Sequence, residues 1–485
     1  MTASKPLVVD LDGSLLRSDS LHESIAAHLR RPGRLWAAAS AGRRGRAAFK
    51  RALAPGTEEA LADAPLNPAV YALIGDAVAV GREVVIATGA DDGVARAIAS
   101  RVNGVREVIA SDGQTNLTGA HKADELVSRF GRGGFDYVGN APVDAAIWDA
   151  ADVAYLATSR ATGVPAWARE RSFAAVLRDP RPPSWRVWMR ALRVHQSLKN
   201  LLLFLPLIAS HTLTDPTLLA RAIIGFVAFT LMASAVYLLN DTLDIASDRT
   251  HPRKRSRPIA AGWISPLHAV AASGALVLCA ILVASLLGPG FVTILLAYAA
   301  MTTAYSFWLK RITVVDIVTL ALLYMVRIVA GAVATGIALS FWFTGVTLFL
   351  FLSLALVKRY AEAHQAREEG RDIRGRGYSG DDVHAILALG AATGVSAVLL
   401  LAIYIQSDAV STLYAAPAVL WLVIPLLFAW IAHLWITAGR GDVHDDPLVF
   451  ALRDPASLVA GALVLIVFFI ASLPVTADVL SGILS

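Results

Sequence analysis

The sequence has a single cysteine, Cys279, so neither a disulfide nor a cysteine-based metal site can form within one chain. It is also poor in charge, because Asp, Glu, Lys and Arg make up 17% of its 485 residues while 56% are hydrophobic. A soluble globular protein carries about 25% charged residues. Residues 1–10 lack a basic stretch followed by an apolar one, so we expect no signal peptide there.

The apolar residues are concentrated after residue 190, in runs close to the length of about 20 residues that crosses a bilayer. The loops between these runs alternate between loops without Lys or Arg and basic loops at 251–255, 310–311, 358–376 and 440. The positive-inside rule places the basic loops and the N-terminal region on the cytoplasmic side of the cell (inner) membrane. The basic residues behind the net charge of +5 are concentrated at the edges of the membrane, so no nucleic-acid partner is expected. Nine spans are predicted, at 195–211, 217–240, 265–287, 290–308, 314–337, 341–357, 384–406, 416–437 and 456–477.

Residues 1–164 have the composition of a soluble domain, 165–194 form a basic linker with Pro and Trp, and 195–485 form the membrane domain. Short β-rich runs at 7–10, 83–87 and 135–138 alternate with helical stretches, which predicts an α/β fold with a Rossmann-type parallel sheet. The basic segment 30–51 is either a helix on an anionic membrane surface or a solvated helical insert. We expect this domain to be fused to an all-α bundle of about nine transmembrane helices.

Three carboxylates and an amide lie at the end of the second apolar run. At about 100° per residue, Asn240, Asp241, Asp244 and Asp248 fall within one quadrant of a single helix. Unpaired acids at the edge of a bilayer are costly unless they hold a cation. Since Mg²⁺ is bound by one or two carboxylates together with substrate phosphates, this segment predicts a site for a Mg²⁺-diphosphate.

Charged and polar residues also lie at the ends of other predicted spans. Arg327 lies deep in its span, which makes it a functional candidate unless it forms a structural ion pair with an acid. The basic residues 253–257 either steer an anionic substrate or anchor the loop. The remaining candidates for substrate binding are Lys199, Asn200, Tyr305, Lys310, Asp316 and Lys358.

The pattern Asn240-Asp241-x-x-Asp244-x-x-x-Asp248, followed by Arg257-Pro-Ile-Ala-Ala-Gly262, resembles the first aspartate motif of UbiA-type intramembrane prenyltransferases. Segments 196–200, 304–310, 326–331, 358–362 and 446–454 resemble the decaprenyl-phosphate phosphoribosyltransferases of that family. The resemblance implies a nine-helix bundle whose cavity opens to lipid. It also implies phosphoribosyl diphosphate as donor, a polyprenyl phosphate as acceptor, and Mg²⁺ as cofactor.

In this interpretation Asp241, Asp244 and Asp248 bind Mg²⁺ and Asn240 orients them. Lys199, Lys310 and Arg327 hold phosphate oxygens, while Asp316 positions an acceptor, a ribose hydroxyl or one of these cations. The alternative is transfer of a prenyl group from its diphosphate to an aromatic or other small acceptor. A transporter is a third reading, but acids at a helix end favour an enzyme at the membrane interface. The oligomeric state is left open.

A second set of residues follows the predicted strands of the soluble domain. Two acids one residue apart at the end of a strand can act as nucleophile and general acid/base, with Mg²⁺ between them. The set resembles the haloacid dehalogenase superfamily of phosphatases, which implies roles for Asp10 (nucleophile), Asp12 (acid/base), Thr88 and Lys122 (phosphate), and Asp10, Asp12, Asn140 and Asp144 (metal). Asn140 stands where many members of that superfamily have a metal-binding Asp. The domain is therefore either a phosphatase acting on the lipid-linked product or an inactive docking module.

Overall fold

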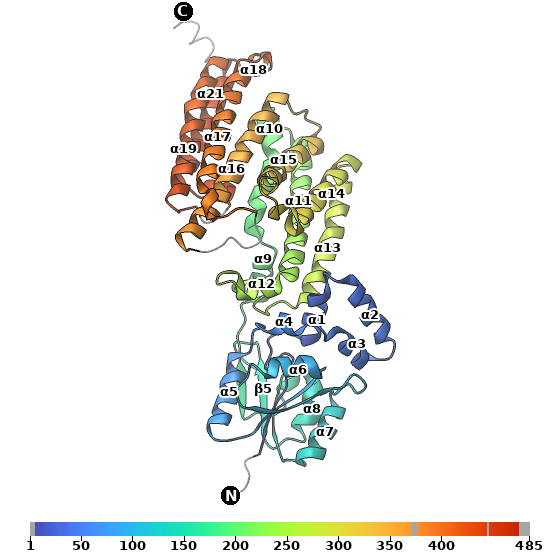
Figure 1. Cartoon of the computed structure of the whole chain (residues 1–485). Coiled ribbons are helices and arrows are strands. Elements are labelled where there is room, and N and C mark those ends of the chain that lie inside the picture. The colour runs from blue at the N-terminus through green and yellow to red at the C-terminus, as the bar shows by residue number, and fades with distance from the viewer. Residues whose placement is uncertain (1–4, 371–376, 444–445, 475–485) are drawn as a thin grey trace, which may run out of the picture. The chain divides into compact units, whose positions relative to one another are not determined.

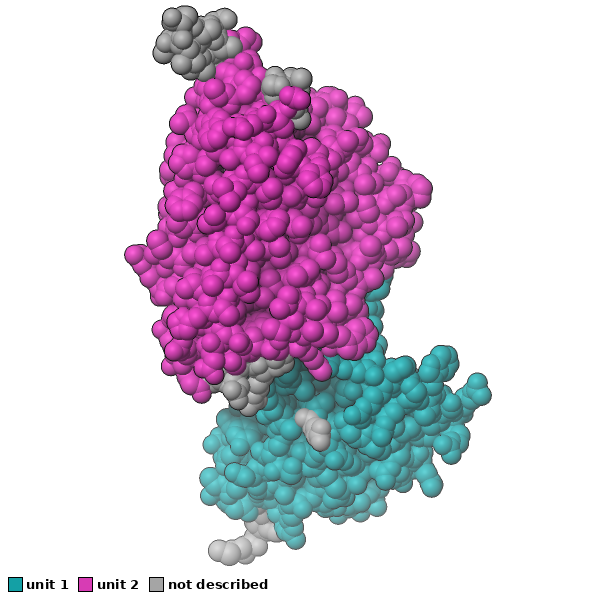
Figure 2. All heavy atoms as spheres, turned by 45° about the horizontal axis from the view of Figure 1, so that its top comes forward, with its two compact units in different colours: residues 1–193, 237–275 teal, residues 194–236, 276–485 magenta. Residues whose placement is uncertain are grey.

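The computed structural model describes residues 5–370, 377–443 and 446–474. It divides into two compact units, drawn in teal and magenta in Figure 2. Unit 1 comprises Met1–Arg193 and Tyr237–Ala275, and unit 2 comprises Val194–Val236 and Leu276–Ser485. The acidic segment 240–248 therefore belongs to the same unit as the N-terminal domain, which the sequence analysis did not predict.

The centre of unit 1 is a six-stranded sheet in the order β3-β2-β1-β4-β5-β6, with every neighbouring pair parallel. The three predicted strands are confirmed, although β2 continues past Thr88 and Gly89. Strand β6 lies within the segment predicted as linker, so the sheet extends further along the chain than expected. The strands are β1 (Leu7–Val9), β2 (Val84–Asp91), β3 (Val105–Ser111), β4 (Asp136–Gly139), β5 (Ala154–Thr158) and β6 (Ala175–Arg178).

Alternating residues of the central strand β1 point into separate cores on the two faces of the sheet. Leu7 and Val9 pack with α5 (Pro68–Ala79) and α6 (Asp92–Ala99), whereas Val8 packs with α7 (Ala120–Phe130) and α8 (Ala145–Trp148). All three β1 residues are fully buried, as expected for a parallel sheet covered on both faces. The carboxyl ends of the strands therefore lie on one edge, where the candidate residues follow them.

The basic segment between β1 and β2 is helical. It forms α1 (Ser20–His28), α2 (Pro32–Gly42), α3 (Arg46–Leu53) and α4 (Glu58–Leu61). Helix α1 begins where the Asp19 carboxylate accepts hydrogen bonds from the Leu21 and His22 amides, which satisfies amides that have no partner within the helix. Unit 1 continues through α9 (Ser184–Ala191), and after α11 through α12 (Ile245–Thr250) and η4 (Lys254–Ser256).

Unit 2 is a bundle of apolar helices. In Figure 1 α16, α17, α19 and α21 run side by side, and these helices contact one another. The helices are η3 (Val194–Phe204), α10 (Leu205–Ala209), α11 (Pro216–Leu243), α13 (Pro266–Ser285), α14 (Pro289–Phe307), η5 (Leu309–Arg311), α15 (Val315–Thr335), α16 (Phe341–Glu368), η6 (Gly380–Asp382), α17 (Val383–Ile405), α18 (Asp408–Leu413), η7 (Pro417–Leu422), α19 (Val423–Gly439), α20 (Pro447–Ala451) and α21 (Pro455–Ser472), with α11 and α13 each shared with unit 1.

Eight helices among the described residues are long and apolar enough to cross a membrane. They coincide with eight of the nine predicted spans. The predicted first span, 195–211, instead forms the short helices η3 and α10, with Pro206 near the junction, so nine spans are not confirmed. Residues 475–477 of the last predicted span and 371–376 of the basic loop lie outside the described residues.

The 3₁₀ helix η3 lies directly against α15, the most deeply buried of the eight apolar helices. A Cβ atom at Gly331 of α15 would lie 2.1 Å from the Leu203 carbonyl oxygen of η3. Only glycine therefore allows the two backbones to approach this closely. The contact holds Lys199 and Asn200, which η3 carries, beside α15.

We expect Gly331→Ala to separate η3 from α15 and to destabilise the protein by about 1–3 kcal/mol, as overpacking of a close contact does. Gly461→Ala in α21 is the matched control, because nothing lies within 4 Å of a Cβ at that position. Thermal unfolding of both variants in detergent tests this expectation. Equal midpoints for the two variants would contradict the proposed packing.

Candidate functional site

Three predicted residues of the soluble domain converge at the carboxyl edge of its sheet. Asp10 follows β1, Lys122 lies in the first turn of α7, and Asp144 follows β4. The Lys122 ammonium donates to Asp10 Oδ1 at 2.7 Å and lies 3.7 Å from Asp144 Oδ1. All three side chains are buried. The Lys122 ammonium thus bridges two carboxylates. It occupies a position in which a cation interacts with both acids.

A residue that the sequence analysis missed completes this cluster. The Tyr137 hydroxyl accepts a hydrogen bond from Lys122 at 2.9 Å and donates one to Asp144 at 3.0 Å. Burial raises the pKa of Asp10 and the neighbouring Asp144 raises it further, although Lys122 opposes both effects. Tyr137 lies on β4, two residues before Gly139. Alternate residues of a strand point to the same face, and this spacing was the only sequence signal that could have identified Tyr137.

Asp12 is held separately from the Lys122 cluster. It accepts hydrogen bonds from the Ser20 amide at 2.7 Å and the Ser20 hydroxyl at 3.0 Å. Burial raises the pKa of Asp12 to about 7, with Asp19 and Asp10 adding to the effect. A carboxyl group that titrates near neutrality suits a general acid/base, because it can both give and take a proton.

The end of β2 supplies a buried hydroxyl and meets an unpredicted lysine. Thr88 is fully buried, and its hydroxyl accepts a hydrogen bond from the Ala90 amide. Lys50 of α3 donates to the Gly89 carbonyl at 2.6 Å and to Asn116 at 2.9 Å. Burial lowers the pKa of Lys50, while Asp12 and Asp19 nearby raise it. In the sequence Lys50 is one of many cations in the basic segment, and only the fold singles it out.

Asn140 lies between the Asp12 loop and Asp144. A Cβ atom at Gly13 would lie 2.2 Å from Asn140 Nδ2, and Gly13 has a φ of +74°, so glycine is required there on both counts. Asp144 accepts from the Asn140 and Ala141 amides at 3.1 Å each. Carboxylate and amide oxygens are hard ligands, so the donor types fit Mg²⁺, and Lys122 marks where positive charge is favoured.

The acidic segment differs from the predicted continuous helix. Helix α11 ends at Leu243 and α12 begins at Ile245, with Asp244 outside helical geometry between them. The prediction of one uninterrupted helix is therefore wrong. Asp241 and Asp248 still face each other, but Asp244 turns away and pairs with Arg30 Nη2 at 2.6 Å.

A single guanidinium joins two of the three acids. Arg257 Nη1 lies 3.1 Å from Asp241 Oδ1 and 2.6 Å from Asp248 Oδ2. Arg193 also pairs with Asp241 at 2.5 Å and stacks on the Tyr237 ring. Burial raises the pKa of Asp248, and Arg257 opposes this effect. Among the described residues no group of three or more His, Cys, Asp or Glu is placed to hold a metal ion. Two carboxylates that share a cation fit Mg²⁺, which needs only one or two.

A buried ion pair connects the helical insert to the acidic segment. Arg249 of α12 and Glu23 of α1 lie 2.7 Å apart, and their side chains are only 2% and 1% exposed. Arg249 also donates to the Ala60 and Ala260 carbonyls, so each of its three guanidinium nitrogens donates a hydrogen bond. The pair links α1 and α4 to the residue directly after Asp248.

In unit 2, two predicted phosphate-binding lysines meet on one acid that was not predicted. Lys199 and Lys358 lie 2.7 and 3.3 Å from Asp446 Oδ2, and the Tyr324 hydroxyl donates to Oδ1 at 2.7 Å. Burial alone would raise the pKa of Asp446, but the two lysines and Tyr324 hold it below its ordinary value. Asp446 lies in a motif used above only for the family resemblance.

Arg327 and Asp316 have different surroundings. Arg327 is buried, and its partners among the described residues are neutral: Asn200 Oδ1 at 2.9 Å, the Tyr298 hydroxyl at 3.2 Å and the Leu323 carbonyl. It therefore forms none of the structural ion pairs considered for it. Asp316 pairs with Arg359 at 2.5 Å, both fully buried, and accepts from Tyr305 and Tyr378. The structure thus pairs Asp316 with a cation outside the predicted set.

Two further predicted residues are located by the elements that carry them. Asn240 lies in the last turn of α11, next to Asp241, and Lys310 lies in η5 at the end of α14. Their roles remain predictions.

The UbiA prenyltransferase family matches residues 201–446, which is more than half of the chain. The chain belongs to the UbiA prenyltransferase family. Protein y4nM of Sinorhizobium fredii is 36% identical over 473 residues, which are 96% of this chain and 91% of that protein. This UbiA-family chain therefore shares both of its parts with that relative.

Other relatives cover a smaller part of the chain. The decaprenyl-phosphate phosphoribosyltransferase of Mycobacterium tuberculosis is 40% identical over 190 residues, which are 38% of this chain and 63% of that enzyme. A solved UbiA homolog of Archaeoglobus fulgidus bound to GPP and Mg²⁺ is 18% identical, with a TM-score of 0.45 over 58% of this chain and 98% of that one.

We expect Glu23→Gln to leave the buried Arg249 charge without compensation and to cost about 3–5 kcal/mol of stability, as breaking a buried ion pair does. Glu83→Gln is the control, because its ion pair with Arg106 is exposed and contributes at most about 1 kcal/mol. Thermal unfolding of the full chain compares the two variants. If both lost the same stability, Glu23–Arg249 would not be the link between α1 and α12.

Proposed function

We propose that this protein is a Mg²⁺-dependent transferase that moves phosphoribose from phosphoribosyl diphosphate to a polyprenyl phosphate in the inner membrane, on its cytoplasmic side. The observation that carries the proposal is the Arg257 guanidinium shared by Asp241 and Asp248 at the end of an apolar helix. A site that already accommodates one cation between two carboxylates suits a divalent ion with a diphosphate. The similarity to decaprenyl-phosphate phosphoribosyltransferase supports this choice of donor and acceptor.

Asp241 and Asp248 would hold the metal, with Asn240 orienting Asp241. Mg²⁺, when bound, neutralises the diphosphate leaving group while positive charge develops on C1 of the ribose. Arg257 and Arg193, which pair with these carboxylates, would donate to diphosphate oxygens when those pairs open. Asp244, which pairs with Arg30, is the third acid of the motif and joins the metal site only if that exposed pair opens.

The cations of unit 2 suit phosphate oxygens. Lys199 and Lys358 share one carboxylate, so one positive charge is left over at Asp446. Arg327 keeps its whole charge, since its partners are neutral. Lys310 is assigned the same role from the motif alone. Charge-assisted hydrogen bonds from such groups hold phosphates strongly.

Asp316 favours phosphoribosyl transfer over prenyl transfer to an aromatic acceptor. It is the only acid in the region of the second aspartate motif, where many aromatic prenyltransferases carry several. Its carboxylate is already engaged by Arg359, Tyr305 and Tyr378. A carboxylate so fully compensated is poorly suited to bind a further metal ion.

We further propose that the N-terminal part of unit 1 is a phosphatase of the haloacid dehalogenase type. Asp10 would be the nucleophile, Asp12 the acid/base, and Thr88 and Lys122 the phosphate-binding residues, with Asp144 and Asn140 completing a metal site. The convergence of Asp10, Lys122 and Asp144 supports this assignment. Its substrate would be the 5-phosphate of the lipid-linked phosphoribose made by the same chain.

The transferase is tested with membranes that contain the protein, Mg²⁺, polyprenyl phosphate and radiolabelled phosphoribosyl diphosphate. Label should enter the organic phase, and Asp241→Asn should lower its transfer more than about 100-fold, in line with the loss of a key electrostatic group. Asp215→Asn, the same change at the other end of α11, should keep full activity. Transfer of a prenyl group from a polyprenyl diphosphate, without transfer of ribosyl label, would overturn the proposed donor.

The phosphatase is tested by following release of inorganic phosphate from the labelled lipid product. Asp10→Asn should abolish this release and leave ribosyl transfer intact. The control is Asp124→Asn, an exposed acid on the same helix as Lys122. Release from generic phosphate esters, but never from the lipid product, would count against the proposed substrate.

A further inference from the structure

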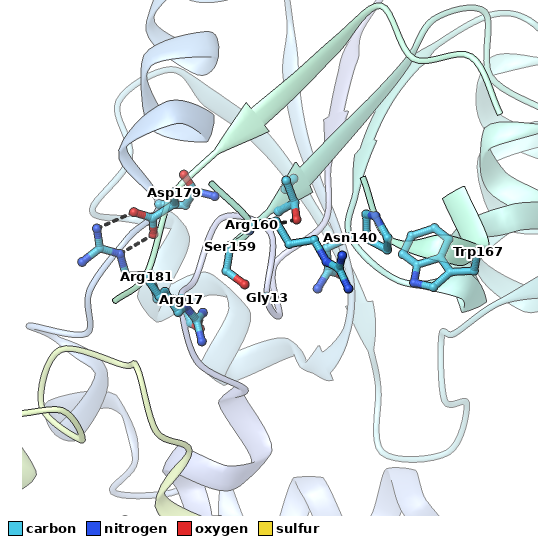
Figure 3. A pocket seen from close by; sticks show the side chains of 12 residues that line it. Gly13, Arg17, Asn140, Ser159, Arg160, Trp167, Asp179 and Arg181 are labelled. Carbon is cyan, nitrogen blue, oxygen red and sulfur yellow. Dashed lines mark hydrogen bonds and ion pairs between the residues drawn. The ribbon is translucent and has the colours of Figure 1, made fainter. Parts of the chain in front are cut away.

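Unit 1 contains a cavity of about 410 Å³ whose arginines the proposed phosphatase chemistry does not use (Figure 3). It is lined by residues that follow four strands: Gly13 after β1, Asn140 after β4, Arg160 after β5 and Arg181 after β6. The cavity therefore lies at the carboxyl edge of the sheet, where ligands of open parallel sheets bind. Its position points to a ligand rather than to a packing defect.

The lining is strongly basic. It contains three arginines and one acid, and that acid, Asp179, is engaged by Arg17 through two contacts of 2.5 and 2.8 Å. Arg160 and Arg181 are left to give the cavity its positive charge. Figure 3 shows the Arg160 side chain between Ser159 and Asn140, on the side opposite Asp179.

Both guanidiniums have donors with no partner among the described residues, although Arg160 is exposed to solvent and Arg181 is partly buried. The Arg160 guanidinium has no hydrogen-bond or ion-pair partner among the described residues. Arg181 donates from Nη2 to the Arg17 carbonyl at 2.8 Å, but its buried Nε has no partner within the described chain. A buried donor left unpaired costs about 1–3 kcal/mol. An anion with several acceptor oxygens, such as a phosphate, removes that cost and pairs well with the planar guanidinium.

One wall of the cavity is rigid and apolar. Trp167 lines it and stacks on Trp148, with ring centroids 5.9 Å apart and 18° between the planes. Trp148 is itself buried in the core between α7 and the sheet. The Trp167 ring is therefore fixed, and it offers a flat surface for a sugar ring or another compact body that carries the anion.

The cavity borders the proposed catalytic residues. Gly13 comes directly after Asp12, and the backbone amide of Asn140 donates to Asp144. Gly13 and Asn140 both line the cavity and lie against each other, since a Cβ atom at Gly13 would lie 2.2 Å from Asn140 Nδ2. A ligand that extends past these two residues would have one phosphate at Asp10 and another group in the cavity.

We propose that Arg160 and Arg181 bind a second phosphate of a ligand whose first phosphate faces Asp10, so that the domain selects bisphosphorylated compounds over monophosphates. The proposal rests on the phosphatase assignment for the position of the first phosphate. The second phosphate is either that of a soluble sugar bisphosphate or the phosphodiester of a lipid-linked sugar phosphate.

The test uses the full chain with Asp10→Asn, which binds without turnover, and isothermal titration with ribose 1,5-bisphosphate and ribose 5-phosphate. The bisphosphate should bind at least about tenfold more tightly, a difference of about 1.4 kcal/mol. Adding Arg160→Gln should remove this preference and leave the affinity for the monophosphate unchanged. Arg106→Gln, an exposed arginine on β3 at the opposite edge of the sheet, should keep the preference.

A lipid source is tested with Asp10 intact, by measuring phosphate release from the lipid-linked product. Arg160→Gln should then raise KM about tenfold or more with little change in kcat, because the second phosphate contributes to binding. The site is supported by an Arg160-dependent preference for the bisphosphate in the titration, or by an Arg160-dependent KM for the lipid-linked product. The proposal is overturned if neither experiment depends on Arg160, or if Arg160→Gln weakens monophosphate and bisphosphate equally. An Arg160-dependent preference without any phosphate release from Asp10-intact protein would retain the site and reject the phosphatase.

Discussion

The buried ion pair between Glu23 and Arg249 determines how unit 1 is built. Two charges withdrawn from water are tolerated only when they compensate each other, so α1 and α12 must meet at this point. Arg249 follows Asp248 directly, and the pair therefore fixes where the acidic segment lies against the helical insert. The contact of Arg30 with Asp244, and the sharing of Arg257 by Asp241 and Asp248, both depend on that placement.

The charge that remains after ion pairs have formed distinguishes charged residues that stabilise the fold from those that bind a ligand. Arg359 pairs with both Asp316 and Glu362, and a buried cluster of this kind, with no spare positive charge, is typical of groups that stabilise a fold. Asp446 faces two lysines, Arg327 faces neutral groups, and the cavity of unit 1 keeps two arginines beyond its single acid. Each of these three places has positive charge to spare, and each suits an anionic group of a substrate. Charge of one sign that remains after ion pairing is therefore a better guide to a binding site than the presence of charged residues alone.

Sequence patterns predicted those features that depend on a local run of residues. Eight spans and strands β1, β2 and β4 follow from continuous apolar stretches. Strands β3, β5 and β6 were missed because each is only partly buried, and β3 and β6 also carry polar residues such as Arg106. The break at Asp244 was missed because a helical wheel assumes continuity. Partners such as Arg30, 214 residues from Asp244, come together only through tertiary structure, and no local pattern encodes that distance.

The return of the chain to unit 1 after α11 has a consequence for biosynthesis. Residues 237–275 complete a unit that begins at the N-terminus, so Glu23 has no counter-ion until Arg249 has been synthesised. Domains usually fold in order from the N-terminus during translation. Here the N-terminal part of unit 1 is incompletely paired until helix α11 and the acidic segment have been synthesised. Folding of unit 1 is thereby tied to synthesis of the acidic segment, and a chain cut after residue 193 would carry Glu23 with no Arg249 to neutralise it.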